Sequence, residues 1–250
     1  MDSGTDIHPS AMLHPTTQLG FRVRIDSGAL VEKDVRLGEG VHVMSRAVIG
    51  QGCQIEAGCI LFPGCVLVGG RPSSILVGEG TVLREHVVIY GGCTECPTVI
   101  GSSSLLMGGV YIGPGCQIGH GVVMGNGTVL CDKVHLGDQC VVGGLSYISG
   151  GNRIGRFAMV GGMSQVLGNV LPFSTSSGSP ARSCGLNTIG LRRAGFSDKM
   201  RMDLKRAYRM VFLEGIDPEE AYLRLLEKMD VTQEVIEFME ALRFQSDVVL

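Results

Sequence analysis

The chain of 250 residues contains no tryptophan, and aromatic residues make up only 5 % of it. It has no run of 18 or more apolar residues, so we expect no membrane-spanning helix. The first residues lack the basic and apolar regions of a secretion signal. The formal net charge of −3 does not indicate nucleic-acid binding.

The chain contains 38 glycines, and its sequence repeats with a period of six residues. A branched aliphatic residue, Leu or Met recurs at every sixth position over 7–67, 77–89 and 100–166, which makes 26 hexads. Neither a helix nor a free-standing strand has this period. A prism-shaped coil explains the period of six, if each hexad forms one side of the prism and its aliphatic residue points inward. Such repeats stack into a solenoid with one continuous core.

The nine cysteines could suggest disulfides or a metal site. Cys53, Cys59 and Cys65 are six residues apart, so they lie on three different sides of the prism and cannot bind one ion. We interpret them as small core or corner residues. Cys93 and Cys96 form a single CxxC without a second pair, so zinc there is the less favoured alternative. We therefore expect no metal, no cofactor and a reducing cytoplasm around the protein.

Two breaks interrupt the hexads, one near 68–76 and one near 91–99. Loops that leave a solenoid often carry function, although a tolerated insertion is the alternative. We expect the solenoid to occupy residues 1–190 and a C-terminal three-helix domain to occupy 191–250. Ser197 is the predicted N-cap of the first helix, which Gly215 ends. The second begins near Pro218 and the third near Thr232.

Several segments of the chain are more specific than the hexads. They include Arg84-Glu85-His-Val-Val-Ile89, Leu105-Leu106-Met107, Val160-Gly161-Gly162 and the block from Gly185 to Phe196. These segments resemble the cytoplasmic UDP-N-acetylglucosamine O-acyltransferases of lipid A synthesis, a family of hexapeptide-repeat acyltransferases. The resemblance covers essentially the whole chain. It implies a mainly β fold, a left-handed parallel β-helix with a C-terminal α-helical domain, and a homotrimer.

The resemblance also implies a reaction. Family members transfer a 3-hydroxyacyl group from acyl carrier protein to the sugar 3-hydroxyl, with a His as general base. In this chain the base position falls on Pro114 and the Asp that follows it falls on Gly115, so neither side chain can move a proton. Four further family histidines are replaced as well, by Tyr90, Tyr111, Ser149 and Phe157.

Some of the family's substrate positions survive. The resemblance implies substrate-binding roles for Asn187, Arg193, Arg84 and Tyr111. The candidates for a substitute base are His86, His120, His135 and Asp132. For each of them the alternative is a structural role. An aspartate in water has a pKa of about 4 and is a weak base for a hydroxyl group unless burial raises that pKa.

A basic stripe is predicted on the first C-terminal helix, because Arg201, Lys205 and Arg209 are spaced four residues apart. It could steer an acidic acyl carrier protein, or it could be an ordinary solvated helix face.

Two functional hypotheses follow. In the first, the chain binds an acylated carrier or a nucleotide sugar and the standard His-base reaction is lost or altered. In the second, it is an active UDP-N-acetylglucosamine O-acyltransferase with an unidentified base.

Overall fold

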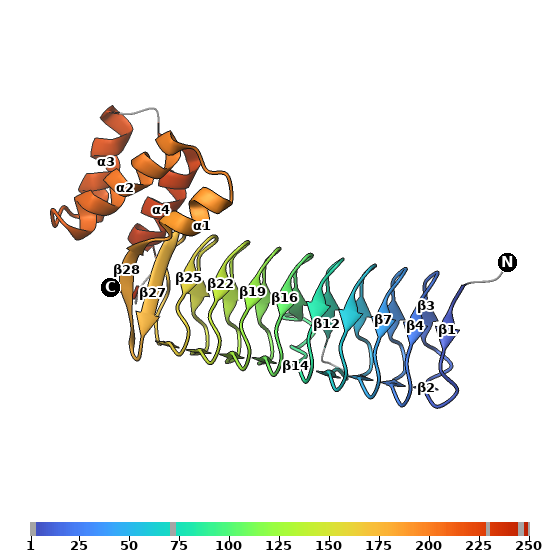
Figure 1. Ribbon diagram of the computed structural model, residues 1–250. Coiled ribbons are helices and arrows are strands. Elements are labelled where there is room, and N and C mark those ends of the chain that lie inside the picture. The colour runs from blue at the N-terminus through green and yellow to red at the C-terminus, as the bar shows by residue number, and fades with distance from the viewer. Residues whose placement is uncertain (1–3, 71–73, 229–230, 245–247, 250) are drawn as a thin grey trace.

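The computed structural model describes residues 4–70, 74–228, 231–244 and 248–249. It is a left-handed parallel β-helix of about nine turns that carries helices at its C-terminal end (Figure 1). The predicted fold class is therefore confirmed. Each of the 26 hexads coincides with one of the first 26 strands of the described chain, and the aliphatic residue is the inward-facing residue of its strand.

Three sheets form the sides of the prism, and we call them sheets A, B and C. Sheet A contains β1 (Asp6–Ile7), β4 (Arg24–Ile25), β7 (His42–Val43), β10 (Ile60–Leu61), β13 (Val82–Leu83), β16 (Leu105–Leu106), β19 (Val123–Met124), β22 (Val141–Val142), β25 (Met159–Val160), β27 (Ser174–Gly178) and β28 (Ala181–Leu186). Sheet B contains β2 (Met12–Leu13), β5 (Leu30–Val31), β8 (Val48–Ile49), β11 (Val66–Val68), β14 (Val88–Tyr90), β17 (Tyr111–Ile112), β20 (Val129–Leu130), β23 (Tyr147–Ile148) and β26 (Gln165–Val166). Sheet C contains β3 (Gln18–Leu19), β6 (Arg36–Leu37), β9 (Gln54–Ile55), β12 (Ile75–Val77), β15 (Thr98–Ile100), β18 (Gln117–Ile118), β21 (His135–Leu136) and β24 (Arg153–Ile154). The strands of the three sheets are parallel except for β28, which pairs antiparallel with β27 at the end of sheet A.

The strands are short because the chain turns a corner after each of them. Successive residues of a strand point to opposite faces, so one side chain enters the core and its neighbour faces outward. Glycine is needed where a corner packs on the next turn. A Cβ atom on Gly143 would lie 2.4 Å from the backbone nitrogen of Gly162, so no larger residue fits without moving the turn. The predicted core role of Cys53, Cys59 and Cys65 is confirmed, since all three are fully buried.

Both breaks in the hexads lie at the corner between sheets B and C, on consecutive turns. They bind each other, since the backbone N–H of Ser74 donates to the carbonyl of Gly92 at 2.9 Å and the N–H of Thr98 donates to the carbonyl of Ser74 at 3.1 Å. The middle of the first break, residues 71–73, lies outside the described residues. The two breaks therefore form one loop layer at this corner.

Four helices are described after the solenoid, namely α1 (Thr188–Arg193), α2 (Asp198–Phe212), α3 (Pro218–Lys228) and α4 (Gln233–Phe244). The Ser197 hydroxyl caps α2 by accepting from the N–H of Met200, as predicted. The starts of α3 and α4 also agree with the prediction, whereas the six-residue α1 was not predicted. None of the described helices is long and apolar enough to cross a membrane.

A second hydrophobic core joins the solenoid to the helices. Phe173 is fully buried and lies within 6.3 Å of the Phe157 ring and 6.0 Å of the Phe196 ring, measured between centroids. The guanidinium of Arg156 lies over the Phe173 ring at 4.8 Å and pairs with Glu237 of α4. These contacts hold the helical domain on the last turns of the prism.

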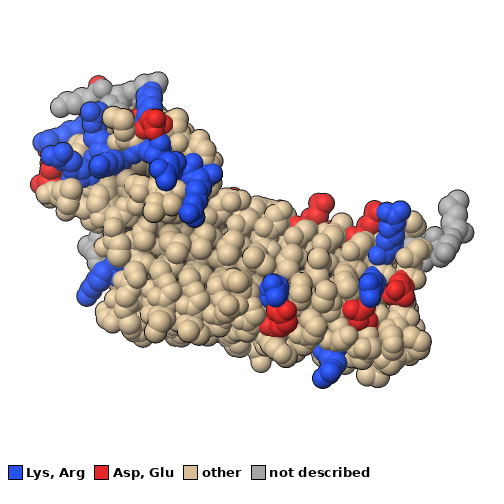
Figure 2. All heavy atoms as spheres, viewed as in Figure 1, with Lys and Arg blue, Asp and Glu red and all other residues tan. Residues whose placement is uncertain are grey.

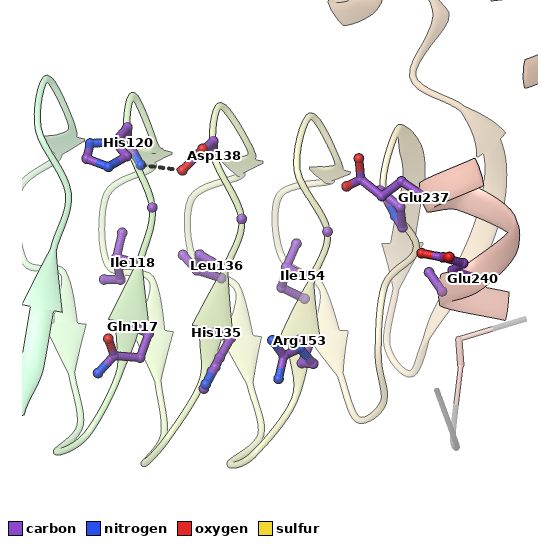
Figure 3. Close-up of a pocket in the computed structure, with 15 residues that line it drawn as sticks. Gln117, Ile118, His120, His135, Leu136, Asp138, Arg153, Ile154, Glu237 and Glu240 are labelled. Atoms are coloured by element: carbon purple, nitrogen blue, oxygen red, sulfur yellow. Dashed lines mark hydrogen bonds between the residues drawn. The ribbon is translucent and has the colours of Figure 1, made fainter. Parts of the chain in front are cut away.

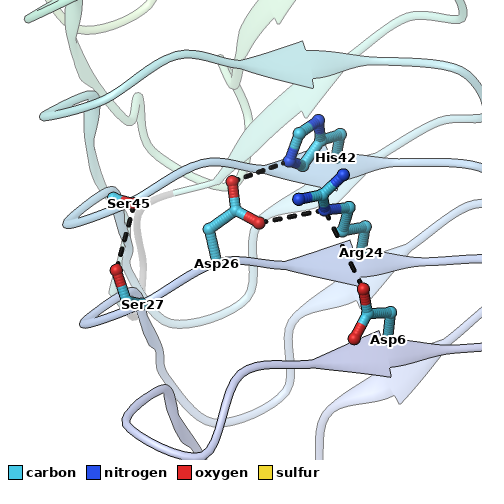
Figure 4. Close-up of polar contacts among 6 residues, drawn as sticks. All are labelled: Asp6, Arg24, Asp26, Ser27, His42 and Ser45. Carbon is cyan, nitrogen blue, oxygen red and sulfur yellow. Dashed lines mark hydrogen bonds and ion pairs between the residues drawn. The ribbon is translucent and has the colours of Figure 1, made fainter.

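A charged network lies on the outward face of sheet A at the N-terminal end (Figure 4). His42 Nε2 lies 2.9 Å from Asp26 Oδ2, and Arg24 Nε donates to Asp26 Oδ1 at 3.0 Å. Burial alone would raise the pKa of Asp26, but the bonds from His42 and Arg24 lower it. Beyond these turns the visible solenoid face carries few charges, while Lys and Arg side chains gather over the helices (Figure 2).

Candidate functional site

Pro114 lies at the corner between sheets B and C, directly after β17. Its carbonyl accepts from the N–H of Lys133, and the N–H of Gly115 donates to Thr98 Oγ1 at 2.9 Å. The corner is therefore held by the second loop and by the next turn. Asp132 occupies the corresponding place on that next turn, with its carboxylate exposed. It is the nearest carboxylate by register to the position where the family has its base.

Three tyrosines line the outward face of sheet B beside this corner, and we call Tyr90, Tyr111 and Tyr147 the tyrosine stripe. Each is a little more than one third exposed. The Tyr90 and Tyr111 rings are 5.5 Å apart between centroids. Burial raises the pKa of Tyr111, and the nearby Tyr90 and Asp132 raise it further. The tyrosine stripe offers ring faces and hydroxyl groups to a ligand.

Tyr147 and its neighbour Cys131 were not among the predicted site residues. The Cys131 thiol donates to the Tyr147 hydroxyl at 3.1 Å, and this contact raises the pKa of Tyr147. Cys131 follows β20 as Gly113 follows β17, so Cys131 lies one turn and Tyr147 lies two turns from the Pro114 corner. The hexad pattern contained a signal for this site, since Tyr111 and Tyr147 occupy the outward position of strands two turns apart.

Two of the replaced histidine positions hold structural side chains. The Ser149 hydroxyl donates to the carbonyl of Val166 at 3.1 Å and contacts the Asn152 amide at 2.6 Å. Phe157 packs edge-on against Phe196 at 4.8 Å between centroids, within the core that joins the helices. Phe157 has no group that can move a proton, and the Ser149 hydroxyl is engaged by its neighbours.

The structure separates the predicted substrate residues. Tyr111 lies beside the Pro114 corner. Arg84 lies at the corner between sheets A and B, where it pairs with Glu85 at 3.0 Å and stacks over Phe62. Asn187 caps α1, because its Oδ1 accepts from the N–H of Gly190 while its Nδ2 donates to the carbonyl of Phe157. Arg193 is exposed at the end of α1. One subunit therefore does not gather these residues into a single pocket.

The candidate histidines lie away from Pro114. His86 is at the corner between sheets A and B, at the opposite end of β14 from the second loop. His120 is at the corner between sheets C and A, and its Nδ1 accepts from the backbone N–H of Ser102 at 3.1 Å. The Ser102 hydroxyl also lies 2.8 Å from the same nitrogen, so His120 Nδ1 is engaged by Ser102.

His135 lies on the outward face of sheet C, in a groove of about 810 Å³ between that sheet and α4 (Figure 3). Burial lowers the pKa of His135 and the charge of Arg153 lowers it further, while Nδ1 has no partner within the described part of the chain. The groove is lined by one cation, Arg153, and by three carboxylates, Asp138, Glu237 and Glu240. His120 also lines it.

The predicted basic stripe on α2 is only partly exposed. Lys205 and Arg209 are exposed and line a largely apolar pocket of about 450 Å³ between α2 and the end of β28. Arg201 is instead half-buried, where it pairs with Asp198 and donates to the carbonyl of Phe196 at 3.2 Å. Arg209 also pairs with Glu214 at 3.0 Å. The accessible basic surface is therefore centred on Lys205 and Arg209.

Comparison with known proteins supports the resemblance in the middle of the solenoid and in the C-terminal part of the chain. Residues 169–247 match the family model described as UDP-N-acetylglucosamine O-acyltransferase, domain 2, and residues 97–132 match the bacterial transferase hexapeptide repeat. The LpxA structure from Acinetobacter baumannii is 26 % identical, with a TM-score of 0.92 and coverage of 98 % of this chain and 99 % of that one.

Two further solved structures agree with this result. The UDP-N-acetylglucosamine acyltransferase from Campylobacter jejuni is 28 % identical, with a TM-score of 0.91 and coverage of 98 % of both chains. The Arabidopsis enzyme of the same name is 25 % identical, with a TM-score of 0.82 and coverage of 98 % of this chain and 100 % of that one. The chain thus resembles the UDP-N-acetylglucosamine O-acyltransferases along its whole length, in the solenoid and in the helical domain.

Proposed function

We propose that this protein binds an acylated carrier protein or a nucleotide sugar at the corner of sheets B and C, and that the standard His-base acyl transfer is lost or altered. The observation that carries the proposal is the occupant of the base position, Pro114, whose side chain has no group that can accept a proton. Free thiols at all nine cysteines support a reducing cytoplasm as its setting.

An active acyltransferase is the second candidate, and the position of Asp132 is the observation that favours it. Its carboxylate lies one turn beyond Pro114 and beside the tyrosine stripe. In this alternative Asp132 would accept the proton of a sugar hydroxyl as that oxygen attacks the acyl thioester. The test is to measure both binding and turnover with an acylated carrier protein and UDP-N-acetylglucosamine. Binding without turnover supports the first proposal, whereas turnover that Asp132→Asn removes supports the second.

We further propose that the working form is a homotrimer. The outward residues of sheets A and B are apolar over consecutive turns, whereas those of sheet C are mostly polar. If sheet A of one copy packs on sheet B of the next, three copies close a ring and leave sheet C in solvent. On sheet A these residues are Ile60, Val82, Leu105, Val123, Val141 and Met159, and on sheet B they are Leu30, Val48, Val66, Val88, Tyr111 and Val129.

This arrangement would place the tyrosine stripe of one copy beside sheet A of its neighbour. Light scattering should give a mass near three times 26.5 kDa. Val123→Asp with Val141→Asp should reduce that mass, because two carboxylates would be buried without partners. Arg36→Asp with Gln54→Asp, on neighbouring strands of sheet C, is the matched control and should leave the mass unchanged. A monomeric wild-type protein at micromolar concentration contradicts the proposal.

The basic surface of α2 is the proposed docking site for the acidic carrier. Lys205→Glu with Arg209→Glu should weaken carrier binding by roughly tenfold or more at low salt, because the attraction depends on unscreened charge. Arg201 is left intact, since it holds the carbonyl of Phe196. Titration with labelled carrier protein at two ionic strengths measures the effect.

The control for this surface is Lys33→Glu with Arg36→Glu, two exposed cations on the N-terminal half of the solenoid. It changes the net charge by the same amount and should leave carrier affinity almost unchanged. Equal losses in both double variants would mean that only total charge matters. Carrier affinity that does not respond to salt would leave Lys205 and Arg209 as ordinary surface.

A further inference from the structure

The second loop contains a hairpin that brings two thiols together. Cys93 and Cys96 pair across the two-residue turn Thr94-Glu95, and the N–H of Cys96 donates to the carbonyl of Cys93 at 3.1 Å. Residues paired in this way have Cα atoms about 5.5 Å apart. Disulfides join residues whose Cα atoms are about 4.4–6.8 Å apart. The backbone therefore already has the spacing that a disulfide requires.

The other cysteines are in different environments. Five are fully buried inside the prism, and burial raises the pKa of all five thiols. Those with a value of about 12 are Cys53, Cys65 and Cys140, the value for Cys116 is about 11, and the fifth is Cys59. Such thiols are poorly ionised and unreactive at neutral pH. Cys93 is exposed and Cys96 is partly exposed, so this pair is accessible to an oxidant.

We propose that Cys93 and Cys96 form a reversible thiol–disulfide site. The exposed Cys93 thiolate attacks a small disulfide such as glutathione disulfide, forms a mixed disulfide and releases one glutathione. The Cys96 thiolate then attacks the Cys93 sulfur and releases the second glutathione. The two protein thiols lose two electrons and two protons, and the oxidant is reduced to two thiols. Disulfides of this transient kind are the ones found in reducing compartments.

The hairpin is attached to the turn that carries Pro114. In the reduced form the Cys96 thiol points to the carbonyl of Gly115 at 3.6 Å, and the carbonyl of Pro97 accepts from the Gln117 amide at 2.6 Å. A Cys93–Cys96 bond turns the Cys96 sulfur away from Gly115 and removes that contact. The oxidation state of the hairpin is thus transmitted to the corner at Pro114 and Gly115.

The experiment uses the full-length protein in glutathione buffers of graded oxidation, with a chelator present, and reads intact mass and fragment masses. We expect wild-type protein to lose the mass of two hydrogen atoms, located between Cys93 and Cys96, and to regain it on reduction. Cys96→Ser should stop at a glutathione adduct on Cys93. Cys184→Ser removes an exposed cysteine elsewhere and should behave as wild type. Wild-type protein that stays reduced in the most oxidising buffer, or that pairs other cysteines, overturns the proposal.

The second measurement is hydrogen exchange at residues 113–117. Exchange there should change on oxidation of the wild type and should not change in Cys93→Ser with Cys96→Ser. An unchanged rate in a fully oxidised protein overturns the link between the hairpin and the Pro114 corner. Neither measurement needs a substrate, so failure here is distinct from failure of the proposed function.

Discussion

Purified protein supplied with an acylated carrier protein and UDP-N-acetylglucosamine should transfer acyl groups about 10²–10⁴-fold more slowly than an acyltransferase of this type that uses a histidine base. The expected loss follows from the chemistry of the step. A sugar hydroxyl attacks a thioester efficiently only when a base removes its proton in the transition state. Pro114 offers no such group. Among the described histidines only His14 lies at the same corner, five turns away, and the others lie on other faces or corners of the prism.

Pro114→His is the direct test of whether the missing base alone explains the loss, and we expect it not to restore turnover. By the resemblance, Tyr111, Ser149 and Phe157 stand where the family has companion histidines, and in the structure Ser149 makes hydrogen bonds and Phe157 packs against Phe196. Adding Gly115→Asp should not help. Gly115 has a φ of +74°, and a Cβ atom there would lie 3.2 Å from the Cys96 sulfur. The double variant is therefore strained as well as incomplete.

Turnover of the unmodified protein at a rate typical of His-base catalysis would contradict this prediction. Single substitutions at His86, His120, His135 and Asp132 would then locate the base. A loss confined to Asp132→Asn would select the active-enzyme alternative. Equal activity in all four variants would point to a base supplied by a neighbouring copy.

Phe173→Ala should lower the free energy of unfolding by about 3–5 kcal/mol, the usual cost of removing a buried phenylalanine. Phe173 lies between the solenoid and the helices, where it contacts Phe157, Phe196 and Arg156. Its removal leaves a cavity at the junction and takes away the surface on which the Arg156–Glu237 pair rests. We therefore expect the helices to become sensitive to protease before the β-helix unfolds.

Phe21→Ala is the matched control, because Phe21 is 46 % exposed on an early turn of the solenoid. Denaturant unfolding of both variants, followed by far-ultraviolet circular dichroism and by limited proteolysis, separates the two effects. Equal and small losses in the two variants would mean that the junction collapses around the missing ring and that Phe173 does not hold the domains together.

The solenoid was predictable because its repeat is local. Each hexad needs one inward aliphatic residue and a corner, so counting hexads gave the 26 strands and their order. The six-residue helix α1 was missed because it is too short to show a helical period. Its N-cap, Asn187, had been interpreted from the resemblance as a substrate residue rather than as a cap. The loops were located, but their mutual hydrogen bonds follow no periodic signal.

The candidate site was less predictable than the fold. Matching the sequence to the family residue by residue placed Arg84 and Tyr111 together among the substrate residues. In the fold, Arg84 lies at the corner between sheets A and B, away from Pro114. The half-burial of Arg201 was also missed, because the spacing of four residues along a helix does not say which cations find partners. The assignment of the base position to Pro114 stays a prediction from the resemblance, and proline has no side-chain group that accepts a proton in any surroundings.

The paired loops at the corner of sheets B and C constrain how this chain can change over evolutionary time. If the second loop were deleted alone, the Ser74 N–H would lose the Gly92 carbonyl that it binds. If the first loop were deleted alone, the Gly92 carbonyl would lose its donor and the Thr98 N–H would lose its acceptor. A chain with only one of the two loops should therefore be less stable than a chain with neither loop or a chain with both. The two insertions should be gained and lost together among relatives, as one inherited unit, although the three strands β12, β13 and β14 lie between them in the sequence.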